Sequence, residues 1–350
     1  MRPVSTADRA RLAASTGVDH LAARQTRGGW WTDWRAGRGG SDEFATALVA
    51  ARICDAPGAA PLVRRAAEAL DSRLVVRRAS GLGGWGWSAA VPGDADSTAW
   101  AVRALAAAGR SHPGDDVRDF LQAHVRDDGA ATYADDAAVR RYMGTVYPEG
   151  HGFGGWTAAS PSVTAAVAAV APDLSAPLVA ALRRGQRDDG SWVDLWWPDP
   201  AHPTSLAAEV LLAAGHGDAA LAAARWSAGA PGADGAFELA ARLRLLVLGL
   251  GLGMRLGLGL DDGPWRSLVS QAASQLIDSQ DPDGSWAPSA RLRVPDPDDA
   301  QPWTHDGAAP GAAVLTSTWV DEERAVSTAC AVSALVLAAE ALDERLSPAR

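Results

Sequence analysis

The amino-acid sequence predicts an all-α protein built from repeated helical hairpins. Three observations lead to this fold class. A short Gln-Gly-Trp pattern returns along the chain, apolar runs of about three helical turns follow its copies, and no stretch shows a convincing strand-like alternation of apolar and polar residues. This order is typical of an array of αα-hairpins rather than of a βαβ succession.

The repeated pattern consists of Gln, three residues, Gly, one residue and Trp. Full copies occupy residues 25–31 (QTRGGWW), 186–192 (QRDDGSW) and 280–286 (QDPDGSW). Two further copies, at residues 83–85 and 154–156, keep only the Gly-x-Trp end. Repetition of this kind indicates that each copy joins two helices of one supersecondary unit, so its Gln and Trp are expected to be structural.

Each Trp is followed by a loop and then by an apolar run headed by a small hydroxyl residue. The two clearest runs are TAWAVRALAAAG at residues 98–109 and TSLAAEVLLAAG at residues 204–215. Because hydroxyl and acidic residues favour helix starts and Gly favours helix ends, both runs predict helices over these ranges. Roughly a dozen helices of average length fit the chain.

Composition narrows the classes of function. The 350 residues are 47% apolar and carry a net charge of −10, which is typical of a globular protein and argues against nucleic acid as a partner. Cys54 and Cys330 are too few for a disulfide framework and show no metal-ligand spacing. The N-terminal residues lack the apolar region of a signal peptide, so a cytoplasmic location is expected.

The tandem Gln-x-x-x-Gly-x-Trp segments resemble the QW repeats of the superfamily that contains squalene cyclases, diterpene cyclases and protein prenyltransferases. The resemblance covers most of the chain and implies a closed α/α-barrel, with residues 1–350 forming a single domain. In that family the Gln caps a neighbouring helix and the Trp stacks across the turn. The likeness carries these roles to Gln186, Trp192, Gln280 and Trp286.

A second resemblance lies in the segment PGDADSTAW at residues 92–100. Class II cyclases carry Asp-x-Asp-Asp followed by Thr-Ala, and their middle Asp protonates the substrate, so the likeness implies that Asp96 is the acid. Asp94 matches the first Asp, whereas Ser97 stands in place of the last. Oxidosqualene cyclases have Asp-Cys-Thr-Ala instead, to which residues 96–99 are also similar. The alternative is that Asp94 or Asp96 is simply the N-cap of a helix.

Protonation of an alkene or epoxide requires a carboxyl group that keeps its proton in a dry site. A carboxyl with the usual pKa of about 4 is ionised at neutral pH, and burial and a neighbouring carboxylate are the effects that raise this pKa. Asp94 and Asp96 are suited to act as such a pair, with Asp94 or Ser97 orienting the proton. The N-terminus of a helix opposes this by stabilising the anion.

The carbocation formed by such a protonation needs stabilisation without a nucleophile, which aromatic faces provide. The sequence contains 15 Trp, and several of those outside the repeats, with Tyr residues that precede Trp156, are candidate substrate contacts. For any one of them, packing is the alternative. The candidates are Trp34, Trp87, Trp100, Tyr133, Tyr142, Trp196, Trp197, Trp303 and Trp319.

The resemblance implies an acid-initiated isomerase or lyase that guides the cyclisation or rearrangement of a small apolar isoprenoid, with no cofactor required. If the substrate is a diphosphate, Mg²⁺ is expected with it and Asp42 and Glu43 are candidate ligands, although helix capping explains both residues equally well. A homo-oligomer, a partner protein and peripheral contact with a membrane stay open. So do two other functions, a non-catalytic barrel that binds a lipid-like ligand or partner and a related enzyme of a non-terpenoid intermediate.

Overall fold

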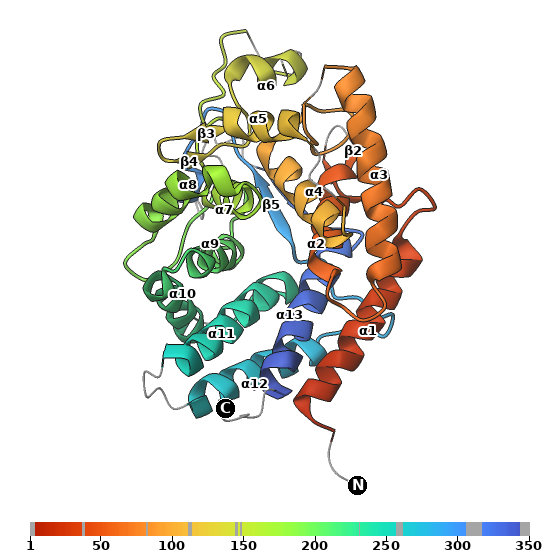
Figure 1. Ribbon diagram of the computed structural model, residues 1–350, viewed down its shortest axis with the longest axis vertical. Coiled ribbons are helices and arrows are strands. Elements are labelled where there is room, and N and C mark those ends of the chain that lie inside the picture. Colours follow the sequence, from red (N-terminus) through yellow and green to blue (C-terminus); the bar gives the residue numbers. More distant parts are fainter. Residues whose placement is uncertain are drawn as a thin grey trace.

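Helices make up most of the computed structural model, which confirms the predicted all-α fold class (Figure 1). Among the described residues there are thirteen α-helices, one 3₁₀ helix and three two-stranded hairpins. The structure describes residues 4–36, 39–81, 83–110, 114–143, 146–147, 149–230, 232–256, 262–305 and 317–343.

Six helices of the described chain form a closed inner ring. Each contacts the next, and the last, α13, contacts the first, α2, so the ring joins segments from both ends of the chain. This closure is the α/α-barrel that the resemblance implied. The inner helices are α2 (Glu43–Ile53), α4 (Ala95–Ala107), α7 (Pro161–Val170), α9 (Ala201–Ala213), α11 (Ala236–Leu256) and α13 (Ala325–Asp343).

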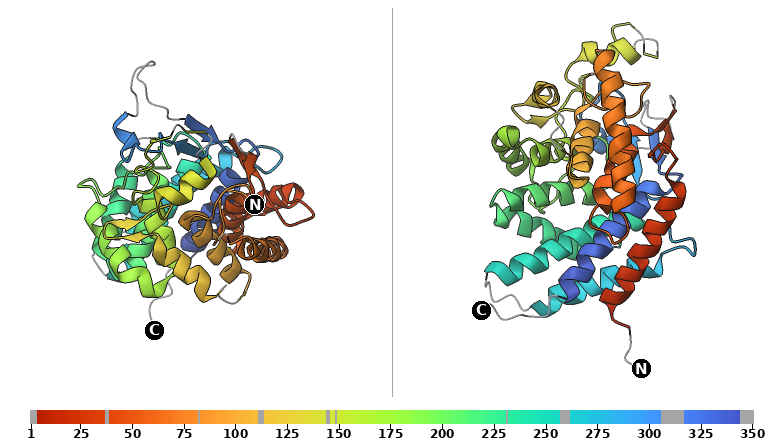
Figure 2. Two further views of the ribbon diagram at one scale, coloured as in Figure 1. Left: turned by 90° about the horizontal axis from the view of Figure 1, so that it is seen from above. Right: turned by 45° about the vertical axis from the view of Figure 1, so that its right-hand side comes forward.

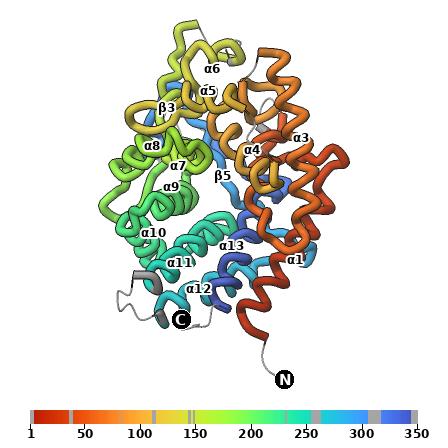
Figure 3. The backbone as a smooth tube through the Cα atoms, viewed as in Figure 1, coloured from red at the N-terminus to blue at the C-terminus, as the bar shows by residue number. Residues whose placement is uncertain are grey.

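An outer layer of helices surrounds this ring, as the views from above and from the side show (Figure 2). Four of the outer helices, α3, α8, α10 and α12, each contact the two inner helices that flank them in the chain, whereas α1 contacts α13 and α12. The short α6 (Asp136–Met143) lies at one edge of the molecule (Figure 3). The outer helices are α1 (Thr6–Arg24), α3 (Ala60–Ala79), α5 (Asp115–Ala123), α8 (Pro172–Gly185), α10 (Gly217–Gly229) and α12 (Asp262–Asp278).

The inner helix α13 is long and apolar enough, by length and composition, to cross a membrane. However, 78% of its most apolar stretch is buried within the protein. A helix that is apolar on all sides is expected where it packs against neighbours all round, as it does in the middle of this ring.

The full Gln-x-x-x-Gly-x-Trp segments share one set of hydrogen bonds. The side-chain amide of Gln186 donates to the carbonyl oxygen of Gly190 in its own turn at 3.1 Å and to that of Ala219 in the next outer helix at 2.9 Å. The indole N–H of Trp192 donates to the carbonyl oxygen of Leu182, in the helix before the turn, at 2.9 Å. Each turn is therefore bonded to the outer helices on both sides of it.

Gln280 closes the outer layer by the same means. Its side-chain amide donates to the carbonyl oxygen of Ala13 at 2.9 Å, which ties the turn after α12 to α1 at the other end of the chain. Gln25 likewise donates to the carbonyl oxygen of Leu62 in α3 at 3.0 Å. These glutamines stabilise contacts between consecutive hairpins and so support the closed ring.

The hydroxyl residues that head the apolar runs do not start their helices. α4 begins at Ala95 and α9 at Ala201, before Thr98 and Thr204. The backbone N–H of Trp192 donates to the Thr204 hydroxyl at 3.0 Å, and that of Trp85 donates to the Thr98 hydroxyl at the same distance. Each threonine thus holds the preceding turn against its inner helix.

The interpretation of residues 154–156 as another copy of the turn is wrong. The indole N–H of Trp156 donates to the carbonyl oxygen of Pro295 at 3.1 Å instead of to a preceding helix. The turn that leads to α7 contains Ala130, whose backbone N–H donates to the Thr164 hydroxyl at 2.9 Å. Since Ala130 has no indole ring, the Trp signal is absent from the true turn.

Strand β5 (Arg291–Val294) crosses the end of the ring at which the inner helices begin (Figure 1). The indole N–H of Trp34, before α2, donates to the carbonyl oxygen of Ala290 at 2.8 Å, and the Arg293 guanidinium donates to that of Asp194, before α9, at 2.7 Å. All the hairpins are antiparallel. The strands are β1 (Asp33–Ala36), β2 (Gly39–Ser41), β3 (Val125–Arg126), β4 (Gly129–Ala130), β5 (Arg291–Val294) and β6 (Ser317–Val320).

Candidate active site

Most of the buried aspartates at this end of the ring cap helices. Asp33 accepts the backbone N–H of Ala325 at the start of α13 at 2.9 Å, and Asp194 accepts that of Ser162 at the start of α7 at 2.9 Å. Asp321 also accepts a backbone N–H from the first turn of α13. Because the first N–H groups of a helix have no partner within it, these carboxylates satisfy donors that burial would otherwise leave unpaired.

Asp94 is also a buried aspartate that caps a helix. It is the N-cap of α4, where one carboxylate oxygen accepts the backbone N–H of Ser97 at 2.7 Å and the other accepts the Ser97 hydroxyl at 2.8 Å. Burial nevertheless raises the pKa of Asp94 to about 7. The capping alternative therefore applies to Asp94, and the Ser97 side chain is bonded to Asp94 and not to Asp96.

Asp96 lies in the first turn of α4 and differs from these aspartates. Its exposed fraction is 9%, and its Oδ1 atom is buried with no hydrogen-bond partner among the described residues. Burial raises the pKa of Asp96 well above its usual value, and the negative charges of Asp94 and Asp194 raise it further, whereas a hydrogen bond from Trp100 opposes the shift. Asp96 is therefore a buried carboxyl group whose surroundings favour its protonated form.

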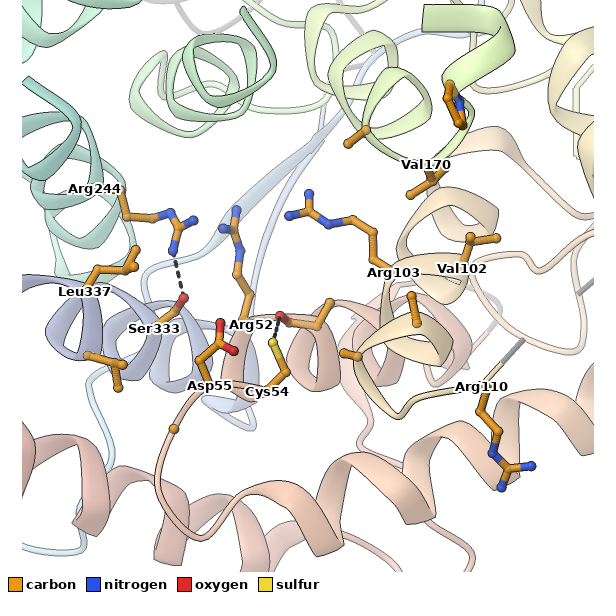
Figure 4. Close-up of a pocket in the computed structure, with 17 residues that line it drawn as sticks. Arg52, Cys54, Asp55, Val102, Arg103, Arg110, Val170, Arg244, Ser333 and Leu337 are labelled. Carbon is orange, nitrogen blue, oxygen red and sulfur yellow. Dashed lines mark hydrogen bonds between the residues drawn. The ribbon is translucent and has the colours of Figure 1, made fainter. Parts of the chain in front are cut away.

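One face of α4 extends from this acid into the ring. Asp96, Trp100 and Arg103 are spaced four and three residues apart, which places them on one side of the helix. Arg103 lines a cavity of about 550 Å³, whose other walls come from α2, α7, α11 and α13 (Figure 4). Residues from five inner helices line one cavity only if it lies inside the ring, and most of these residues are Ala, Val or Leu.

Three of the predicted aromatic residues form one cluster near the start of α2. The Trp34 ring lies 5.6 Å from the Trp87 ring and 6.2 Å from the Trp197 ring, centroid to centroid. Phe44 joins the cluster at 5.9 Å from Trp34, and Phe237 stacks on Trp197 at 5.1 Å. Counting Trp and Tyr could not identify these two phenylalanines, which no local motif marks.

The backbone of Trp34 has φ 42°, in the left-handed region that a bulky residue seldom adopts. Such strain persists only where the surrounding structure holds it, here through the hydrogen bond of the indole to Ala290. The ring of Trp34 is thus fixed in orientation.

Two other predicted residues belong to a second aromatic cluster. Tyr133 lies 6.1 Å and Trp196 5.8 Å from the ring of Trp156, centroid to centroid. Burial, and then the charge of Asp94, raises the pKa of Tyr133, which places this phenol in the surroundings of the acid. The second cluster is therefore next to the aspartate pair.

The remaining predicted aromatics do not join these clusters. Tyr142 lies on α6, Trp303 on the 3₁₀ helix (Pro302–His305) and Trp319 on β6, and none of the three has a ring contact with another described aromatic residue. Trp100 instead contacts two guanidinium groups, those of Arg52 at 5.0 Å and Arg103 at 4.7 Å from its ring centroid.

The predicted metal ligands are engaged by arginines. Glu43 is fully buried, and its two oxygens lie 2.5 Å from the Arg73 guanidinium and 2.8 Å from that of Arg77. Asp42 lies 3.2 Å from Arg73. Among the residues that the structure describes, no group of three or more His, Cys, Asp or Glu side chains is arranged to hold a metal ion. The magnesium site at Asp42 and Glu43 stays a prediction, and the two arginines neutralise the charge on which it depends.

No family model and no curated protein matches the sequence. Solved structures do match. A variant of the type II terpene cyclase MstE from Scytonema, in complex with its substrate geranylgeranyl dihydroxybenzoate, is 29% identical and has a TM-score of 0.83, with 96% of this chain and 99% of that chain covered. Another variant, in complex with its product merosterolic acid A, has a TM-score of 0.85 at the same identity.

Two further structures widen the comparison. A protein from Actinoplanes is 34% identical, with a TM-score of 0.80 over 94% of this chain and 99% of that chain. The ent-copalyl diphosphate synthase from Streptomyces platensis is 20% identical, with a TM-score of 0.52 over 86% of this chain and 50% of that chain. At that identity the likeness to the synthase shows the fold alone.

Proposed function

This chain belongs to the class II terpenoid cyclase superfamily, and we propose that it uses Asp96 to protonate an alkene or epoxide of an isoprenoid substrate and so starts a carbocation cyclisation. The observation that carries the proposal is the condition of this carboxyl group. It is buried, one oxygen has no partner, and its pKa is raised by burial and by two carboxylates. The other buried aspartates described above are engaged by helix N-termini.

In the first step the proton moves from the Asp96 carboxyl to a terminal alkene carbon or to an epoxide oxygen. Asp96 becomes a carboxylate, and the substrate becomes a tertiary carbocation. Internal double bonds then attack the cation in turn, and each new C–C bond consumes one π bond. When the last cation loses a proton, product and substrate are isomers, and Asp96 takes up a proton before the next turnover.

The surrounding residues serve this step in two ways. The negative charges of Asp94 and Asp194 oppose ionisation of Asp96 before the substrate reacts, which favours the protonated form of Asp96. The faces of Trp34, Trp87 and Trp197 offer negative quadrupoles to a passing cation without offering a nucleophile. Ser97 acts indirectly, because its bonds to Asp94 fix the start of the helix that carries the acid.

An isoprenoid chain is proposed as the substrate because of the likeness to MstE, whose substrate is geranylgeranyl dihydroxybenzoate. The proton transfer itself requires no cofactor, and Mg²⁺ enters the proposal only for a diphosphate substrate. The proposal places the enzyme in the cytoplasm and leaves open a homo-oligomer and contact with a membrane.

The test uses geranylgeranyl dihydroxybenzoate as the probe, with the reaction run in D₂O. Acid initiation predicts a cyclised product that carries one deuterium at the former terminal alkene, whereas Asp96→Asn gives no product. Asp94→Asn is the matched control, since Asn still caps a helix, and it is expected to retain part of the turnover. Tight binding of the probe with no conversion by the wild type would favour a lipid-binding barrel instead.

A further inference from the structure

Three arginine side chains meet in the cavity inside the ring. Arg52 from α2, Arg103 from α4 and Arg244 from α11 point toward a common space, as Figure 4 shows. Of the three, only Arg244 forms an ion pair with a described residue. It lies 2.7 Å from the Glu209 carboxylate and donates to the Ser333 hydroxyl at 2.8 Å.

Arg52 and Arg103 have no ion-pair partner among the described residues. The exposed fraction of Arg52 is 5%, and its Nε atom is buried without a hydrogen-bond partner. Arg103 is half-buried. Both guanidiniums lie over the indole ring of Trp100, which offsets their removal from water only in part. Burial lowers the pKa of Arg52 to about 10, so it stays charged at neutral pH.

The other charged groups around the cavity do not balance this excess. The Glu209 carboxylate is paired with Arg244, and Asp55, which also lines the cavity, is exposed to solvent. Cys54 and Cys330 are uncharged thiols whose pKa burial raises, and burial and the three arginines hold the pKa of His202 well below its usual value. Three guanidiniums therefore face a single half-buried carboxylate, that of Glu209.

A buried charge without a partner is costly, and proteins normally pair it with a counter-ion. Here the unpaired guanidiniums face an open space with apolar walls. A ligand with an anionic end and an apolar body satisfies both features, because the guanidinium fork binds a carboxylate by two parallel hydrogen bonds.

We propose that Arg52 and Arg103, which line this cavity, bind the carboxylate head group of the isoprenoid substrate whose terminal alkene is protonated by Asp96. This inference rests on the proposed function. Asp96 and Arg103 lie seven residues apart on one face of α4, about 10 Å along the helix axis at 1.5 Å per residue. The acid end therefore receives the terminal alkene and the arginine end the head group, which sets the direction in which the chain folds before protonation.

A carboxylate fits this site better than a diphosphate does. A diphosphate carries more negative charge than the two unpaired guanidiniums balance, and it is usually bound with Mg²⁺. No cluster of metal-ligating side chains is present among the described residues, and the carboxylate of Glu209 already forms an ion pair with Arg244. A single carboxylate shared by Arg52 and Arg103 requires no metal ion.

The experiment compares three probes, geranylgeranyl dihydroxybenzoate, its methyl ester and geranylgeranyl diphosphate, by their quenching of tryptophan fluorescence. The wild type is expected to bind the free acid at least about tenfold more tightly than the ester, because a hydrogen bond to a charged group contributes that much or more to an equilibrium constant. In Arg52→Met and Arg103→Met this preference falls toward one. Arg110→Met is the matched control, since Arg110 is paired with Asp71 at 3.0 Å and its guanidinium lies apart from the other three (Figure 4), and it keeps the preference.

Equal affinity of the wild type for acid and ester would overturn the inference without any variant, and so would tighter binding of the diphosphate. Retention of the acid preference in both arginine variants would also overturn it. The two proposals fail separately. If the free acid and the methyl ester give deuterated cyclic product with equal efficiency, the head-group site is excluded and protonation by Asp96 is supported. If the wild type strongly prefers the free acid but forms no product, the mechanism is excluded and the binding site is supported.

Discussion

Replacing Asp96 by Asn removes the transferable proton and changes little in shape. The proposed mechanism predicts loss of turnover, but an inactive variant alone does not show that the acid is protonated at rest. The raised pKa of Asp96 has a second consequence that activity does not report, namely a dependence of stability on pH. Unfolding therefore tests the state of the carboxyl group independently of any substrate.

The magnitude follows from proton linkage. In the unfolded chain Asp96 ionises at its usual pKa, whereas in the folded protein, where the pKa is raised, it stays protonated, so folding must take up a proton. Each pH unit between the two pKa values costs about 1.4 kcal/mol. The stabilising effect of this group is thus present at low pH and is lost as pH rises. Asn carries no such cost, although its buried amide adds a pH-independent penalty of about 1–3 kcal/mol.

Urea unfolding of wild type and Asp96→Asn at several pH values measures this difference. The stability of the variant relative to the wild type should increase with pH, and turnover should be absent at every pH. Asp188→Asn, at an exposed turn, is a control for the chemical change. A constant difference between Asp96→Asn and wild type from pH 4 to pH 8 would mean that Asp96 is ionised in the folded protein, which would refute the assignment of a resting acid.

Three further predictions concern stability. Trp286→Ala should cost about 3–5 kcal/mol, as large-to-small core changes do, because this fully buried indole also donates to a helix carbonyl; an unchanged melting temperature would contradict the structural role of the repeat. Glu43→Gln should cost on the order of 3–5 kcal/mol in urea unfolding because it leaves the buried guanidinium of Arg77 without its counter-charge, and a neutral effect would reopen the metal assignment. The free energy of unfolding of Asp321→Asn relative to that of the wild type should rise as pH increases from about 4 to about 7. Burial raises the pKa of Asp321 to about 7, so the Asp321 carboxyl stabilises the wild type at low pH and this effect is lost over that range; a constant difference would contradict the raised pKa.

The Gln-x-x-x-Gly-x-Trp turns are predictable from sequence because most of the groups that build one lie within a few residues of each other. The same locality explains the error at residues 154–156, where a Trp pattern arises without the hydrogen bonds that define the turn. It also explains the missed turn at Ala130, which keeps the backbone bond to Thr164 but lacks the indole. Asp96 is predictable only through the resemblance of its segment to cyclase motifs.

The sequence by itself determined the helical periodicity, the repeated turns and the presence of two acidic residues at the start of one apolar helix, since these depend on neighbours along the chain. Only the tertiary structure decided which carboxyl group stays without a backbone partner. Asp33 is satisfied by Ala325, across nearly the whole chain, and Asp194 by Ser162, whereas no helix N-terminus reaches the Oδ1 atom of Asp96. Ring closure sets these distances, because it brings helix starts that are remote in sequence to one end of the barrel.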